Sequence, residues 1–459
     1  MISLFRAFPN GVSVCSQILT RRSVHHNAGV KFQGSVVTRR REKFETNNHW
    51  TSENVNELIR EDSELPGHIR AKSNQFIKEI GDTKTVLLLG STGTMGPYFL
   101  ETLCNMEQIS NVVCLMRGNN DVVYRNLKSW QHVKTENLHK VTCVNGNVAF
   151  PHLGMSDRLW DSLTNSVDAV INCAARIHHT EIYTNNDSNR DARAVNVGGI
   201  KNILEFACEN RLKHVFHAGT FLAASKVREG VIAEGWPEDV GDFDFATSLA
   251  YPITKFVSEM LFKEAAKRGI PCKVFRFPIV TGNSKTGKFC LNNNHVMLRY
   301  ISILTNGAIP SSPMPMPMLP IDQCAEISMK IFFHDKGGQS DLYNITHPNV
   351  DIDQEFVQVA KRFGKRVSLV DDEEFAKSLE RDLERGTNFG AFKNYYVKDQ
   401  FWKKYRCHLP LFKFWRPGND GYFVSKKLET LMPDIYDPEE RTMDYVYKDL
   451  KFAKNNGWF

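Results

Sequence analysis

The sequence predicts an α/β fold, a doubly wound parallel sheet with a mostly helical C-terminal subdomain. Short apolar runs, too brief for helices, alternate along the first two thirds of the chain with longer segments of helical periodicity. The last third loses this alternation and continues as a Met- and Pro-rich loop followed by helical patterns. A chain of 459 residues, 42% hydrophobic and 24% charged, has the composition of a globular protein and the length of two or three domains.

The expected strands are continuous apolar runs, as parallel strands buried on both faces require. They are Thr85 to Leu89, Val112 to Met116, Val141 to Val144, Asp168 to Asn172, His214 to His217, Lys273 to Phe277 and Leu342 to Ile345. The clearest helical segments between them are Val195 to Glu209 and Tyr251 to Arg268. We therefore predict a sheet domain at 83–285 and a C-terminal subdomain at 286–459, of which residues 321–350 return to the sheet.

Most of the positive charge lies at the N-terminus. Residues 1–41 carry seven Arg and Lys and no acidic residue, so the rest has a net charge of −1 within the total of +6. This composition is typical of a mitochondrial transit peptide, and we expect a mitochondrial protein; a tail that is not a targeting signal would leave it in the cytoplasm. Residues 42–82 are expected to form a polar linker. The near-neutral body does not indicate nucleic-acid binding.

Two further classes of protein are not indicated. No apolar run approaches the ~18 residues that a membrane-spanning helix needs. The ten cysteines form no C-x-x-C pair, so the sequence indicates neither a metal site nor a disulfide scaffold.

Three glycines separate the first predicted strand from the helix after it. Gly90 allows the tight turn, Gly93 lets the backbone approach a pyrophosphate, and Gly96 lets the helix pack on the strand. The N–H groups at the start of that helix favour phosphate. The remaining loop residues are Ser91, Thr92, Thr94 and Met95. The loop predicts a dinucleotide cofactor.

The residue at the end of the second strand distinguishes NAD from NADP. Arg117 stands there, 21 residues after Gly96, and Arg125 follows about two helical turns later. A guanidinium group matches the geometry of a 2′-phosphate, whereas the nearest carboxylate, Asp121, lies past the strand end. We therefore expect NADPH.

A tyrosine and a lysine open one of the predicted helices. The i,i+4 spacing of Tyr251 and Lys255 places both on one face. The ammonium group and the positive nicotinamide of the oxidised cofactor are expected to lower the pKa of Tyr251. Thr220, just past a strand end, would donate to the same substrate oxygen, and Asn196 would hold a water that relays protons through Lys255. The alternative for Tyr251 and Lys255 is a solvated helix pair.

These residues resemble those of an extended short-chain dehydrogenase/reductase. More narrowly, the chain resembles the thioester reductase domains that end carboxylic acid reductases, α-aminoadipate reductases and reductive non-ribosomal peptide synthetases. The resemblance runs from about Asp62 to Glu380. It rests on Gly90 to Gly96, Leu115-Met-Arg117, Asp168 to Ala175, Asn196-Val-Gly, Ala218-Gly-Thr220, Tyr251 to Lys255, Arg276-Phe-Pro278 and Gly307-Ala-Ile-Pro310.

The resemblance implies a Rossmann-like NADP-binding domain at 83–285 and a substrate-binding subdomain after it. Thr220, Tyr251 and Lys255 would be catalytic, with Asn196 beside them. Beyond the glycine loop and the arginines, the implied cofactor-binding residues are Asn147, Val148, Ala174, Ala175 and Pro278, together with Tyr251 and Lys255. NADPH would reduce an acyl thioester to an aldehyde and a free thiol, and a second hydride would give the alcohol.

The chain departs from the family pattern in three ways. Asn147 stands for the usual Asp, and Gly219 for the serine that often precedes the catalytic threonine. The sequence shows no adenylation domain and no carrier segment, so we expect the substrate as a CoA thioester or on a carrier protein supplied in trans. Other functions stay open: a fatty acyl-CoA reductase, a sterol or sugar-nucleotide oxidoreductase, or a non-catalytic NADP-binding subunit.

The segment from Phe401 to Trp415 mixes aromatic with basic side chains. Such a mixture would suit contact with a membrane surface or an acyl chain. A subdomain core with basic side chains reaching out to solvent is the alternative.

Overall fold

A computed structural model describes much of the chain, and its described residues fall in one compact unit, Trp50–Phe459. They are 52–118, 121–122, 125, 134–177, 181, 183, 191–224, 227–228, 231–232, 234–239, 250–291, 294–311, 315–335, 339–387, 425–437 and 439–459. The predicted transit segment, 1–41, and the aromatic and basic segment, 401–415, lie outside these ranges.

A seven-stranded parallel sheet forms the centre of the fold, in the order β13-β8-β5-β4-β1-β2-β3. Its strands are β1 (Thr85–Leu89), β2 (Asn111–Met116), β3 (Val141–Asn145), β4 (Ala169–Asn172), β5 (His214–Thr220), β8 (Cys272–Phe277) and β13 (Asp341–Asn344). The chain leaves β1 toward β2 on one side and later returns to β4 on the other. The predicted doubly wound α/β fold is therefore confirmed, and β13, from the region expected to return to the sheet, forms its edge.

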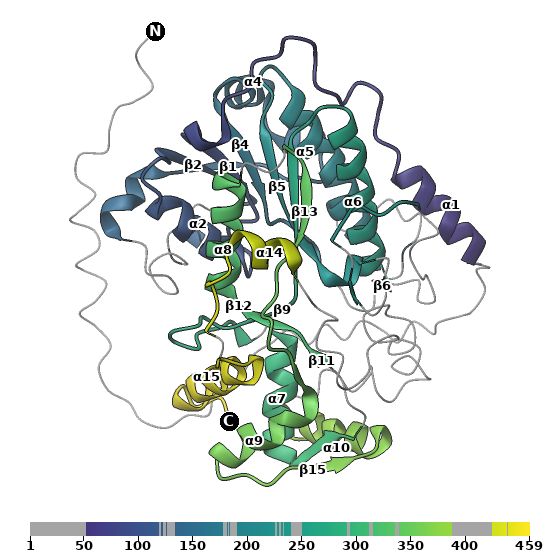
Figure 1. The fold of residues 1–459 in the computed structure, drawn as a ribbon, viewed down its shortest axis with the longest axis vertical. Helices are drawn as coiled ribbons and strands as arrows, with labels where there is room; N and C mark the ends of the chain where they lie inside the picture. Colours follow the sequence, from purple (N-terminus) through teal and green to yellow (C-terminus); the bar gives the residue numbers. More distant parts are fainter. Residues whose placement is uncertain are drawn as a thin grey trace. The chain divides into compact units, whose positions relative to one another are not determined.

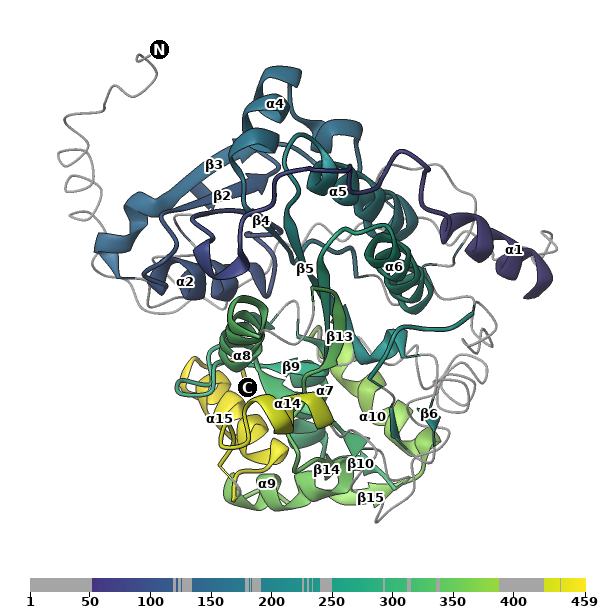
Figure 2. The same cartoon turned by 45° about the horizontal axis from the view of Figure 1, so that its top comes forward.

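Helices cover both faces of the sheet (Figures 1 and 2). One core contains residues of α4, α5 and α6, and a second core contains residues of α2 and α8. The bounds are α2 (Gly96–Asn105), α4 (Asp157–Ser166), α5 (Gly199–Cys208), α6 (Ala250–Lys267) and α8 (Ile321–His334). A π-helical turn, Ala194–Gly198, leads into α5, and a short 3-10 turn, Phe221–Ala223, follows β5. The other 3-10 turns are Ile80–Asp82, Thr135–Lys140, Pro151–Gly154 and Asp353–Glu355.

The C-terminal part has a third core of its own, below the sheet in Figure 1. Its helices are α7 (His295–Asn306), α9 (Phe356–Arg362), α10 (Asp372–Glu384) and α15 (Thr442–Asn455), while α14 (Lys426–Leu431) packs on β13. Three small strand pairs accompany them: β9 (Ile279–Thr281) with β12 (Met318–Pro320), β10 (Ala308–Pro310) with β15 (Ser368–Val370), and β11 (Pro315–Met316) with β14 (Asp351–Ile352). We refer to this part as the C-terminal lobe. A fourth pair, β6 (Val227–Arg228) with β7 (Val231–Ile232), lies in the segment between β5 and α6. No helix among the described residues is long and apolar enough to cross a bilayer.

The segment expected to be a polar linker contributes to the core. Helix α1 (Ser52–Asp62) buries Val55, Leu58 and Ile59 against the face that carries α5 and α6. These apolar side chains stand at i, i+3 and i+4, which puts them on one side of the helix. Downstream, Ile77 forms an isolated bridge with Leu212. The segment is polar on average, but the amphipathic pattern of Val55 to Ile59 is visible in the sequence, and three apolar residues at helical spacing are enough to attach a short helix.

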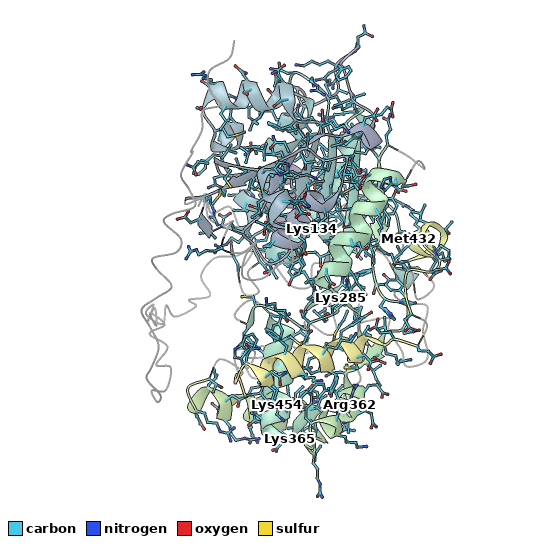
Figure 3. All side chains as sticks on the ribbon, turned by 90° about the vertical axis from the view of Figure 1, so that its left-hand side faces the viewer. Lys134, Lys285, Arg362, Lys365, Met432 and Lys454 are labelled. Atoms are coloured by element: carbon cyan, nitrogen blue, oxygen red, sulfur yellow. The ribbon has the colours of Figure 1, made fainter. Side chains whose placement is uncertain are left out.

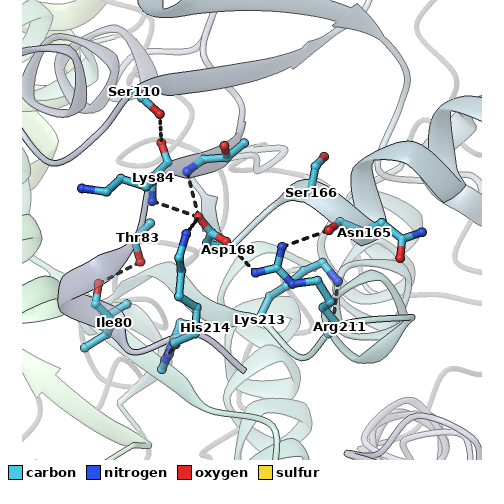
Figure 4. A network of polar contacts seen from close by, with 12 residues as sticks. Ile80, Thr83, Lys84, Ser110, Asn165, Ser166, Asp168, Arg211, Lys213 and His214 are labelled. Carbon is cyan, nitrogen blue, oxygen red and sulfur yellow. Dashed lines mark hydrogen bonds and ion pairs between the residues drawn. The ribbon is translucent and has the colours of Figure 1, made fainter. Parts of the chain in front are cut away.

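A buried carboxylate ties the N-terminal ends of the central strands together (Figure 4). Asp168 Oδ2 accepts from Lys84 N at 2.9 Å, Thr85 N at 3.0 Å and Lys78 Nζ at 3.0 Å. Its Oδ1 accepts from Arg211 Nη2 at 2.8 Å. Burial alone would raise the pKa of Asp168, but these hydrogen bonds lower it overall. The carboxylate therefore stabilises the fold at neutral pH, and this stabilisation is lost as the pH falls through its folded-state pKa.

We predict that Asp168→Asn lowers the free energy of unfolding by about 3 kcal/mol, because two cations lose their buried partner. Urea denaturation near neutral pH measures the change. The control is Glu136→Gln, which changes an exposed carboxylate in the 3-10 turn before β3 and should change the free energy of unfolding little. Equal stabilities for the Asp168 variant and the wild type would contradict this account of the network.

Candidate active site

The glycine loop follows β1, at the point where the order of the strands switches from one side of β1 to the other. It therefore lies between the carboxyl ends of β1 and β4. Gly90 has a φ of +85°, and a Cβ built there would stand 2.7 Å from Ala174 N. A Cβ on Gly96 would stand 2.0 Å from Gly90 O. Both positions therefore require glycine, and the crevice beside them is where open parallel sheets bind their ligands.

Helix α2 begins directly after this loop, and its N-cap residue, Met95, makes no side-chain cap hydrogen bond. Thr92, Gly93 and Thr94 are exposed, whereas Ser91 is buried and Met95 partly so. The dipole of α2 favours a negatively charged group at this point, and the glycines let the backbone approach it. The residues present thus fit the pyrophosphate of a dinucleotide cofactor.

The other residues predicted to bind the cofactor lie around the same edge of the sheet. Ala174 is partly buried and held by Asn172 Oδ1, which accepts from its N–H at 3.0 Å. Ala175, Arg117 and Arg125 are exposed. Three more lie at strand ends: Asn147 after β3, Val148 in the core against α5, and Pro278 between β8 and β9. The side chain of Val148 is therefore used in the core.

Two hydroxyl groups meet at the carboxyl end of β5. Thr220 is the last residue of β5, and its Oγ1 accepts from Leu222 N at 3.3 Å. Tyr251 is in the first turn of α6, and a hydrogen bond joins its side chain to that of Thr220. The structure thus brings together two residues that are 31 positions apart, as predicted, because α6 packs across the end of β5.

Lys255 is buried on the same helix, but its ammonium group does not have the partner that the sequence suggested. Lys255 Nζ donates to the main-chain oxygen of Ala218 at 2.9 Å. Burial lowers the pKa of Lys255 to about 8, while the nearby Cys173 and Glu259 act in the opposite direction. This lysine is therefore held against the backbone of β5, one turn of helix beyond Tyr251.

The predicted lowering of the tyrosine pKa is wrong for the protein alone. Burial raises the pKa of Tyr251 to about 12, and only its hydrogen bond with Thr220 opposes the rise. A nearby ammonium group would lower this pKa, but the desolvation of the buried phenol has the larger effect here. Tyr251 is consequently a protonated hydrogen-bond donor at neutral pH.

Asn196 also differs from the expectation that it holds a relaying water. Its Nδ2 donates to Arg176 O and to Thr254 Oγ1, both at 3.0 Å, and its Oδ1 accepts from Arg176 N at 2.8 Å. Both amide hydrogens are therefore used by protein groups. Asn196 instead joins the loop after β4 to α6 through Thr254, the residue directly before Lys255.

A layer of buried polar groups under α6 was missed by the sequence analysis. Asn172 Nδ2 donates to His217 Nδ1 at 3.0 Å, and burial lowers the pKa of His217 well below its ordinary value, with Lys255 adding to the effect. Arg276 binds both oxygens of Glu259, at 2.8 and 2.6 Å. One signal was available, since Glu259 follows Lys255 at i+4.

Cysteines and other metal-ligating side chains are scattered in the described part of the chain. Its eight cysteines are free, and no group of three or more His, Cys, Asp or Glu there could hold a metal ion.

The sequence pattern of a NAD-binding family described as male sterility protein matches residues 88–328, which is more than half of the chain. The chain belongs to this family. The match extends from the glycine loop to α8 and so includes Thr220, Tyr251 and Lys255. The predicted resemblance to extended short-chain dehydrogenase/reductases of the thioester reductase type is confirmed, and with it a nicotinamide cofactor and the class of NAD(P)-dependent oxidoreductases.

One relative of this chain is the L-2-aminoadipate reductase large subunit of Penicillium chrysogenum, which is 28% identical over 323 residues. The matched region is 66% of this chain and 22% of that protein. The chain thus spans less than a quarter of the relative's length. Among solved structures, the terminal R domain of the myxalamid PKS-NRPS pathway has a TM-score of 0.71 at 21% identity and covers 88% of this chain and 99% of its own. The reductase domain of a Mycobacterium tuberculosis non-ribosomal peptide synthetase has a TM-score of 0.61 at 17% identity, covering 88% of this chain and 96% of its own. At these identities the likeness shows the fold.

We predict that Lys255→Met changes the pH dependence of stability. Since the folded-state pKa of Lys255 is about 8 against an ordinary 10.5, only the unfolded chain keeps this proton between those pH values. The resulting penalty grows as the pH falls and is complete below the folded-state pKa. The stability advantage of Lys255→Met over wild type should therefore be larger at about pH 7.5 than at about pH 10, by about 2 kcal/mol.

Urea denaturation at both pH values measures this difference. Lys267→Met, at the exposed end of the same helix, is the matched control and should show no such change with pH. A difference between Lys255→Met and wild type that is independent of pH would mean that Lys255 is charged in the folded protein over the whole range.

Proposed function

We propose that this protein is an NADPH-dependent reductase that converts an acyl thioester to an aldehyde. The observation that carries the proposal is the pair of hydroxyl groups, Thr220 and Tyr251, at the same carboxyl edge of the sheet as the glycine loop. Two donors that converge on one point suit a carbonyl oxygen that becomes negatively charged during reaction. When bound in this crevice, NADPH would supply the hydride.

The raised pKa of Tyr251 suits the direction of reduction. A phenol with a pKa of about 12 is protonated at neutral pH, so it can donate to the developing oxyanion without first capturing a proton. Thr220 would donate to the same oxygen. The tetrahedral hemithioacetal would then collapse: its carbon–sulfur bond breaks, the thiol leaves with a proton, and the carbonyl of the aldehyde forms. A second reduction at this site would give the alcohol.

Lys255 would support Tyr251 from below. Its ammonium group is fixed by Ala218 O and lies in a buried environment whose other charges, Glu259 and Arg276, neutralise one another. With a pKa of about 8, Lys255 can gain and lose a proton near neutral pH. It is thus suited to return a proton to the phenol between turnovers.

The choice of NADPH over NADH rests on Arg117, exposed at the end of β2. We predict that Arg117→Asp weakens NADPH binding about 10- to 100-fold while NADH binding stays within about twofold, because one charge-assisted contact to phosphate is lost. Fluorescence titration with each nucleotide measures both affinities. Arg158→Asp, an exposed arginine of α4, is the control. An unchanged preference for NADPH in Arg117→Asp would remove this basis for the assignment.

The acyl group would arrive as a CoA thioester or on a carrier protein. Figure 3 shows Arg362, Lys365 and Lys454 on the outer surface of the C-terminal lobe, with Lys285 nearer the sheet. Helices α9 and α15 meet there, since Arg362 pairs with Asp444 and Lys454 lies 5.7 Å from the ring of Phe363. Exposed cations favour anionic partners, which both the CoA phosphates and an acidic carrier would provide.

The deciding experiment follows NADPH oxidation by absorbance with acetyl-, hexanoyl-, palmitoyl- and succinyl-CoA and with acyl-loaded carrier proteins. Mass spectrometry identifies the aldehyde or alcohol. We predict turnover of a thioester by wild type and a loss of about 10²- to 10⁴-fold in kcat for Tyr251→Phe, because the proton donor is removed. Tyr447→Phe, in the C-terminal lobe, is the control and should retain activity.

Two outcomes would contradict the proposal. Turnover only of a sterol or a sugar nucleotide would assign the same residues to a different reduction. Binding of NADPH without oxidation by any of these substrates would favour a non-catalytic NADP-binding subunit.

A further inference from the structure

Glu181 makes three contacts around the start of α6, and the sequence analysis gave it no role. Its main-chain oxygen accepts from Ala250 N at 2.8 Å, the residue directly before Tyr251. Its carboxylate accepts from Ala192 N at 2.7 Å and from Arg176 Nε at 3.1 Å. One residue therefore holds the first N–H group of α6, the segment before the π-helical turn, and the loop after β4.

Arg176 is held from two directions. Its side chain pairs with Glu181, and its own backbone N–H and C=O both bind the amide of Asn196. Asn196 also donates to Thr254, the residue directly before Lys255. The loop that carries Ala174 and Ala175, two of the predicted cofactor-binding residues, is thus linked to the helix that carries Tyr251 and Lys255.

Helix α1 provides an outer anchor for the same region. Asp62, at its end, accepts from Arg193 Nε at 2.6 Å and Arg193 Nη2 at 2.8 Å, and also from the hydroxyl of Tyr183. Arg193 directly precedes the π-helical turn that contains Asn196, and Tyr183 lies two residues after Glu181. Each element around Glu181 is therefore tied to a rigid neighbour.

We propose that Glu181, through its ion pair with Arg176, is a positioning residue that fixes the N-terminus of α6 and so the hydroxyl of Tyr251 relative to the cofactor loop. This inference rests on the proposed function for its effect on rate. The structural part of the inference does not depend on the proposed function. Without the Glu181 carboxylate, the contacts with Ala192 and Arg176 are weakened, and the first turn of α6 loses a constraint.

The consequence should be catalytic rather than global. The first turn of α6 contributes Ala250 and Ile253 to the core, whereas the rest of the helix contributes larger side chains such as Phe256 and Leu261. Loosening the first turn therefore leaves most of the core contacts of α6 in place. A displacement of a reacting group by about 1 Å can cost up to about 10²-fold in rate. Binding energy for the acyl chain, made elsewhere, is unaffected.

The test compares Glu181→Gln and Arg176→Gln, alone and combined, in the full chain. Glu264→Gln is the matched control, because Glu264 also pairs with an arginine, Arg268, but near the other end of α6. Steady-state kinetics use NADPH and whichever acyl-CoA of the panel the wild type reduces best. Hydrogen–deuterium exchange is measured for peptides that cover residues 250–255, without any substrate.

We expect each single variant to lose about tenfold or more in kcat with KM within about twofold of wild type. The double variant should lose no more than the larger single loss, because the two residues act through one contact. Exchange at 250–255 should rise in these variants but not in Glu264→Gln, while the melting temperature stays close to that of wild type.

The two readouts separate this inference from the proposed function. If the wild type reduces no acyl thioester, the proposed function fails, and exchange alone decides whether Glu181 constrains α6. Wild-type exchange in both Glu181→Gln and Arg176→Gln would overturn the inference. So would additive losses of kcat in the double variant, since they would mean that the two side chains act separately.

Discussion

The packing of α6 across the carboxyl end of β5 is the constraint on which the rest of the site depends. Lys255 Nζ reaches Ala218 O in the middle of β5, and Tyr251 reaches Thr220 at its end. These two contacts fix the position of α6 along the direction of β5. Apolar residues of the same helix form much of the core on that face, so the fold and the reactive groups are positioned by one interface.

Burial at this interface decides which proton each group carries. It raises the pKa of Tyr251 and lowers that of Lys255, so both groups are driven toward their neutral forms. Burial also raises the pKa of Glu259, and its ion pair with Arg276 opposes the rise. The site therefore presents Tyr251 as a protonated hydrogen-bond donor, on the same helix as an amine, Lys255, whose pKa of about 8 lies near neutral pH. This is what the stabilisation of an oxyanion in a reduction requires.

Much of the fold and the identity of the reacting groups can be predicted from the sequence, because strands, glycines and the Tyr–Lys spacing are local patterns. The orientation of side chains cannot. Lys255 binds a backbone oxygen whose place depends on how β5 meets α6, and Asn196 is used by Arg176, which follows another strand. Glu181 carries no pattern at all, because its partners lie from 5 to 69 residues away in the chain. The amphipathic pattern of α1 is visible in the sequence, but the part of the core against which it packs is not.

The central claim is that Tyr251 is a protonated donor in the resting protein, and the most direct measurement is its titration by NMR. Protein labelled with ¹³Cζ-tyrosine, with the resonance assigned from Tyr251→Phe, reports the ionisation of this phenol alone. The account predicts no ionisation at neutral pH and a midpoint of about 12, above the ~10 of an ordinary tyrosine. A midpoint of roughly 7 to 8 in the cofactor-free protein would contradict it, since the phenol would then be ionised before any substrate arrives.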